Sequence, residues 1–133
     1  MGTSKISLIS GVYIILGLYT FAFNNSDETV SKLAYTAGNQ TQAEQLAKTG
    51  LSLALLKLYY YNPSTNYSST YFSTQNASSM GGSVTYKASV VSGLASDERQ
   101  VVATGTIGNT TVTVTAVVHY NSGRWRIERT YLQ

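Results

Sequence analysis

The feature that most constrains this chain is a helical pattern that begins near Ser4 and continues to about Leu58. The only proline is Pro63, and proline is the residue that interrupts a helix interior most strongly. One continuous helix over this segment would extend for about 80 Å. A single small globular domain does not need a helix of that length. The segment must therefore find partners beyond one local core.

The first half of this helix is apolar on all sides. Residues 6–26 contain no charged side chain, and most of them are large and apolar. A run of about 20 such residues spans the hydrocarbon of a bilayer. Lys5 precedes the run, and Asp27 and Glu28 follow it, which favours a cytoplasmic amino terminus and an exterior position for the rest. The sequence therefore predicts that residues 1–25 lie in a membrane or among other helices.

The second half of the helix is amphipathic and needs a surface to cover. Its apolar positions recur at helical spacing, namely Ala43, Leu46, Ala47, Gly50, Leu51, Ala54, Leu55 and Leu58.

For the amino-terminal apolar run, a removed secretory signal is disfavoured, because no small-x-small cleavage site follows the run. A plain membrane anchor remains an alternative. A chain that carries both halves can exchange lipid for the helices of neighbouring subunits.

The sequence beyond the helix, residues 59–133, changes to sheet patterns. Residues 62–82 are rich in Ser, Thr, Asn, Tyr and Gly, which predicts a long surface loop. Alternating stretches follow at Ser83–Val91, Arg99–Ile107, Thr110–Tyr120 and Arg124–Leu132. Gly108-Asn109 and Asn121-Ser122-Gly123 are typical of tight hairpin turns. We therefore predict an α+β fold in which the long helix of residues 1–58 packs on a four-stranded antiparallel meander.

Composition argues against an enzyme. Charged residues make up 11% of the chain and cysteine is absent, so no thiolate nucleophile or zinc–sulfur site is available. No phosphate loop or dinucleotide fingerprint is present, and we expect no catalytic site, metal or cofactor. His119 is expected to be structural, and Asp97-Glu98 to form a solvated turn rather than a cation site. The net charge of +3 is small and spread out, so no nucleic-acid partner is expected.

The order of these elements resembles type IV pilins and pseudopilins. Residues 39–51 (NQTQAEQLAKTGL) are similar to an A-E-x-x-A-x-x-G-L pattern in the helix of minor pilins. Residues 102–107, residues 111–118 and Trp125 resemble the sheet of the same proteins. The resemblance covers nearly the whole chain and rests mainly on the order of its elements.

The resemblance implies a structural subunit of an extracellular helical surface filament. Such a subunit resides in the inner membrane before assembly, where it interacts with the pilus assembly machinery, and then polymerises with copies of itself. The residues implied in assembly and the filament core are Lys5, Ile6, Ile9, Gly11, Tyr13, Ile14, Leu16, Gly17, Leu18, Phe21, Phe23, Asp27 and Glu28. The family's usual glutamate at the fifth mature position is missing. That position holds Lys5 if Met1 is the mature terminus, and Ser7 if Gly2 is the cleavage-site glycine.

Two alternative functions stay open at this point. The chain could be a minor pilin or pseudopilin at a filament tip or in a secretion apparatus, which the missing glutamate favours. It could also be a membrane-anchored extracellular binding domain with a tyrosine-rich loop. Asn66, Asn76 and Asn109 each begin an N-x-Ser/Thr pattern and are candidate glycosylation sites.

Overall fold

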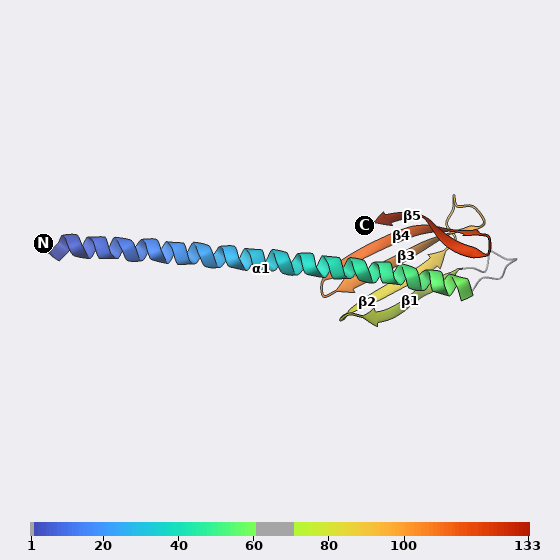
Figure 1. Cartoon of the computed structure of the whole chain (residues 1–133), viewed down its shortest axis with the longest axis horizontal. Coiled ribbons are helices and arrows are strands. Elements are labelled where there is room, and N and C mark those ends of the chain that lie inside the picture. The colour runs from blue at the N-terminus through green and yellow to red at the C-terminus, as the bar shows by residue number, and fades with distance from the viewer. Residues whose placement is uncertain (1, 61–70) are drawn as a thin grey trace. The chain divides into compact units, whose positions relative to one another are not determined.

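The computed structural model describes residues 2–60 and 71–133, with side chains described from Ser10 onward. The chain divides into two units, Met1–Ala37 and Gly38–Gln133. One helix, α1 (Gly2–Tyr60), belongs to both units (Figure 1). The helix predicted from about Ser4 to about Leu58 is thus confirmed, with its last residue two positions further on. Nothing in this stretch, which lacks proline, interrupts the helical hydrogen bonds.

The second unit contains one antiparallel sheet whose strands follow the order of the sequence. They are β1 (Phe72–Ser79), β2 (Gly82–Ser89), β3 (Glu98–Ile107), β4 (Thr110–Asn121) and β5 (Arg124–Leu132). Each strand pairs with the next one, so β1 and β5 are the two edges. Residues 38–60 of α1 cross one face of this sheet (Figure 1). The α+β prediction is therefore confirmed.

The two predicted hairpin turns contain residues with positive φ. At the β3–β4 turn Gly108 takes a φ of 55°, and at the β4–β5 turn Ser122 and Gly123 take φ values of 53° and 82°. Positive φ at both central residues, as in the β4–β5 turn, is typical of a type I′ turn, and positive φ at the first central glycine alone, as in the β3–β4 turn, is typical of a type II′ turn. Both turn types match the twist of the flanking strands. Both turns fall where the sequence predicts them.

The predicted number of strands was wrong, because the sheet has five strands rather than four. The additional strand, β1, lies inside the segment 62–82 that the composition assigned to a loop. Only Phe72 at its start is buried, while the rest of the strand is polar apart from Ala77 and mostly exposed. An edge strand of this kind lacks the alternating apolar pattern that identifies a strand in a sequence.

The core of the second unit lies between α1 and the face of the sheet that we call the inner face. On the sheet it is formed by Val84, Ala88, Val101, Ala103, Val112, Val114, Ala116 and Val118, and on α1 by Ala43, Leu46, Ala47, Leu51, Ala54 and Leu58. The strand residues alternate with threonines on the opposite, outer face, as the period of two requires. Several helix residues are alanines, so the helix backbone lies close to the strands.

Candidate functional site

The most prominent surface of the chain is the apolar part of α1 in the first unit. No residue from Ser10 to Ala37 is buried. Large apolar side chains along it are between 48% and 75% exposed, and they are Val12, Tyr13, Ile14, Ile15, Leu16, Leu18, Tyr19, Phe21, Phe23, Val30, Leu33 and Tyr35. Isolated apolar side chains on a surface are ordinary, but a continuous set of this size marks an interface.

The apolar side chains surround the helix instead of forming one stripe. Residues 12–16 are consecutive large apolar residues, and consecutive helical residues are separated by about 100° around the axis. A helix that is apolar on all sides is stable only when it is enclosed by lipid or by other protein. One flat partner would leave the opposite side of this segment in water.

Small and polar residues inside this segment do not oppose such burial. A Cβ atom built at Gly11 or Gly17 would meet nothing within 4 Å, so both positions leave room for close approach by another helix. The hydroxyl of Thr20 donates a 2.9 Å hydrogen bond to the carbonyl oxygen of Leu16. Its polar group is therefore satisfied within the helix and needs no water.

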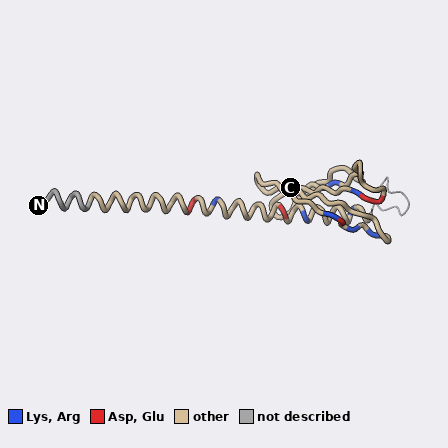
Figure 2. Tube along the Cα trace, turned by 90° about the horizontal axis from the view of Figure 1, so that it is seen from above, with Lys and Arg blue, Asp and Glu red and all other residues tan. Residues whose placement is uncertain are grey.

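After Lys5, the next charged residues on α1 are Asp27 and Glu28. Figure 2 shows the long uncharged stretch ahead of these two acids. Glu28 forms an ion pair with Lys32 at 2.7 Å, and both side chains are more than half exposed. Exposed pairs of this type contribute at most about 1 kcal/mol. The same helix contains Ile14, Leu16, Leu18, Phe21 and Phe23, and their role in assembly stays a prediction. The side chains of Lys5, Ile6 and Ile9 lie outside the described residues.

Within the described residues, α1 contains no stretch that is long and apolar enough to cross a membrane. The predicted apolar segment begins at Ile6, ahead of the first described side chain. Its membrane insertion therefore stays a prediction.

The sheet region contains one contact that the sequence did not indicate. His119 Nε2 lies 2.7 Å from Asp97 Oδ2, and the backbone N–H of Tyr120 donates to the carbonyl oxygen of Asp97 at 2.9 Å. The hydrogen bond from His119 lowers the pKa of Asp97 below its ordinary value of 3.8. These two bonds attach the β2–β3 connection to β4. The described residues contain no group of three or more potential metal ligands.

Arg99 is a buried charged residue that the sequence analysis did not identify. It is 1% exposed and donates from Nη1 to the carbonyl oxygens of Ser96, at 2.8 Å, and Glu98. Its guanidinium also lies 5.8 Å from the centre of the Trp125 ring, a cation–π distance. Burial lowers the pKa of Arg99. The sequence did contain an indication of this site. Arg99 alternates in step with Val101 and Ala103 and therefore lies on the inner face of β3, where a charged residue is unusual.

The candidate glycosylation sites differ in position. Asn76 lies on the edge strand β1 and Asn109 in the β3–β4 turn, and both are exposed. Asn66 lies outside the described residues.

Comparisons with known proteins give this chain no relative: no family model, no curated protein and no solved structure matches it.

Proposed function

We propose that this chain is a structural, non-enzymatic subunit of an extracellular helical surface filament, assembled with copies of itself through residues 1–25. The observation that supports the proposal is the ring of exposed apolar side chains around α1 in the first unit. The second unit has its own hydrophobic core, and none of the described side chains from Ser10 to Ala37 is buried. The apolar helix is thus available to other copies.

A filament supplies the enclosure that this segment requires. When many copies bring their helices together, every side of each apolar helix meets another helix, which a single flat partner cannot achieve. Burial contributes roughly 25 cal/mol per Å² of apolar area, before the entropic cost of association. Before assembly, the same surface would be covered by the inner membrane, where the assembly machinery of pilus-like systems acts.

Electron microscopy of material sheared from cells tests the proposal, combined with mass spectrometry of the subunit's amino terminus. We expect thin filaments composed mainly of this chain. Filaments that carry it in trace amounts would instead indicate a subunit at a tip. A monomer that stays with the membrane would contradict assembly and indicate an anchored binding domain.

Substitutions in the helix separate assembly from folding. Ile14→Asp and Leu16→Asp each place a charge in the apolar surface, so we expect them to abolish filaments. Thr111→Asp introduces the same charge at an exposed position on β4 and serves as the matched control. Fluorescence of Trp125, the only tryptophan, reports whether the sheet is folded. Filaments that persist in both helix variants would overturn the proposal.

A further inference from the structure

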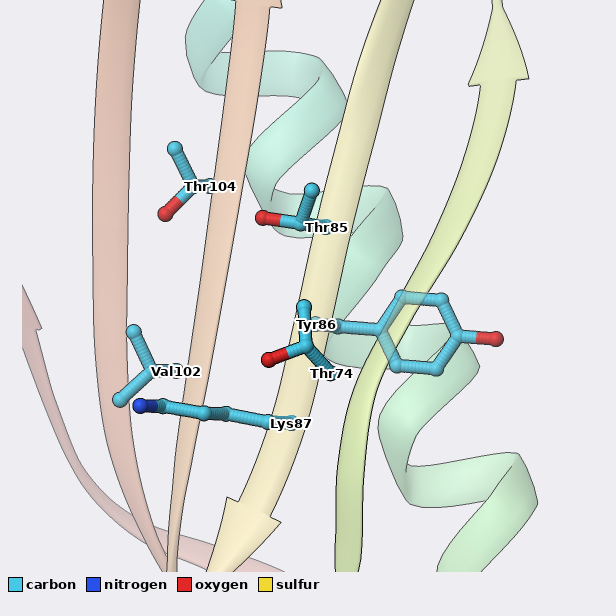
Figure 3. Close-up of a pocket in the computed structure, with 6 residues that line it drawn as sticks. All are labelled: Thr74, Thr85, Tyr86, Lys87, Val102 and Thr104. Atoms are coloured by element: carbon cyan, nitrogen blue, oxygen red, sulfur yellow. The ribbon is translucent and has the colours of Figure 1, made fainter.

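The outer face of the sheet contains a hollow of about 210 Å³ that no part of the filament proposal uses. It is lined by Thr74, Thr85, Tyr86, Lys87, Val102 and Thr104 (Figure 3). β1 changes register between Phe72 and Gln75 at this place. Such irregularities bend an edge strand and are frequent next to binding sites.

The hydroxyl groups in the hollow form part of an ordered array. Thr104 pairs with Thr85 on β2 and with Thr113 on β4, and the hydroxyls of Thr104 and Thr113 lie 3.1 Å apart. In the next row, the hydroxyls of Thr106 and Thr111 lie 3.3 Å apart. Each hydroxyl can donate and accept, while the threonine methyl groups and Val102 supply apolar area between them.

Lys87 provides the only charge among the lining residues. It pairs with Val102 across the strands, and Figure 3 shows its side chain extended over β3 toward Val102. No ion pair or hydrogen bond of its ammonium group is found among the described residues. Two acids of the second unit have other partners, since Glu44 pairs with Lys48 and Asp97 with His119. The ammonium group is thus available to an anion.

Further positive charge lies on the same face at the other edge of the sheet. Three arginines of β5 lie opposite outer-face residues of β4, because their partners alternate with the inner-face residues. The pairs are Arg124 with Asn121, Arg126 with His119, and Arg129 with Val117. All three arginines are exposed. β2 and β5 are three strand spacings apart, or about 14 Å. A ligand that contacts both Lys87 and these arginines must be a chain of several residues.

We propose that the hollow binds a uronic-acid residue of an acidic polysaccharide. The sugar hydroxyls bind Thr85 and Thr104, the carboxylate binds the Lys87 ammonium, and the polysaccharide continues toward the arginines of β5. A nucleic acid fits the hollow less well, because single strands bind by stacking on aromatic rings. The only aromatic lining residue, Tyr86, alternates along β2 with Thr85 and Lys87, and its ring packs against the core, edge-on to Phe72 with ring centres 6.0 Å apart. The proposal goes beyond filament formation and does not depend on it.

Binding of a defined oligogalacturonate to the full chain in neutral detergent micelles tests the proposal, with isothermal titration calorimetry as the assay. We expect measurable binding that is lost when the carboxylates of the probe are methyl-esterified. Lys87→Gln should weaken binding about tenfold, because a charge-assisted hydrogen bond is removed. The paired change Thr85→Val and Thr104→Val should weaken it similarly while it preserves side-chain shape.

Lys48→Gln is the matched control, since it removes the same charge from α1, away from the hollow. It should leave the affinity unchanged. Equal losses for Lys87→Gln and Lys48→Gln, or tighter binding of a single-stranded oligonucleotide of equal charge, would show general attraction of anions and overturn the proposal. So would undiminished binding of the methyl-esterified probe, or no binding at all. Trp125 fluorescence verifies that each variant is folded.

Discussion

Substitution of Gly105 by alanine tests how closely α1 approaches the sheet in the second unit. Gly105 lies on β3, directly below the helix. A Cβ atom built there would contact the carbonyl oxygen of Ala43 and would lie 2.6 Å from the backbone nitrogen of Ala47 and 2.8 Å from Leu46 Cβ. Two of these three atoms belong to the helix backbone. They cannot rotate away as the end of a flexible side chain could.

The expected destabilisation follows from this geometry. The helix and β3 must separate by a large part of an ångström along the contact, which loosens the packing of every neighbouring core residue. Overpacking of this kind costs about 3 kcal/mol of unfolding free energy when backbone has to move. With a urea dependence of about 1.5 kcal/mol per M, the unfolding midpoint should fall by about 2 M.

The assay is urea unfolding of the full chain in neutral detergent micelles, followed by the fluorescence of Trp125, which packs against the core. Gly38→Ala is the matched control, because a Cβ atom there meets nothing within 4 Å and α1 is helical at this position. Alanine should raise stability there by up to about 1 kcal/mol. If Gly105→Ala were as harmless as Gly38→Ala, the close contact between α1 and β3 would be refuted.

Three further predictions concern the second unit and use the same unfolding assay. Leu58→Ala should lower the unfolding free energy by about 2–5 kcal/mol, because Leu58 is fully buried, while Leu56→Ala, at a position 52% exposed, should change it by less than about 1 kcal/mol. Similar values for the two would contradict the orientation of α1. Arg99→Met should destabilise the chain by about 2–4 kcal/mol, since it leaves the carbonyls at the start of β3 without their donor; an unchanged midpoint would show that this donor is dispensable. The stability that Asp97 contributes is present above its ordinary pKa of 3.8 and is lost as the pH falls through its lower folded value. Asp97→Asn should therefore lower the urea midpoint of unfolding at pH 6, and the midpoint of this variant should fall less steeply as the pH is lowered below about 4. If the midpoint of the variant fell as steeply with pH as that of the unchanged chain, the role of the His119 contact would be refuted.

Much of the fold could be predicted because its signals are local. The helix follows from apolar spacing without proline, and β4 follows from the alternation of valines and threonines in residues 111–118. Both patterns depend only on which residues are near in sequence. β1 escaped prediction because an edge strand with one buried residue, Phe72, has a polar composition that resembles a loop.

The sites were less accessible to sequence reasoning because they depend on strand register. Asp97 and His119 are 22 residues apart, and they meet because β3 and β4 align Glu98 with His119. The hollow on the outer face likewise combines residues of β1, β2 and β3 that are separated in sequence. Arg99 was hidden by the expectation that inward strand positions are apolar. Its burial is tolerated only because nearby carbonyl oxygens accept its hydrogen bonds.

The order of the strands has a consequence for how fast the second unit can fold. Every strand pairs with its immediate neighbour in sequence, so each pairing closes a short loop and has a small entropic cost. Such a meander has a low contact order for a sheet, which favours rapid folding. The docking of residues 38–60 of α1 joins segments far apart in sequence. Formation of the hairpins can thus precede helix docking. The small residues of α1 then pack against an inner face of the sheet that has already formed.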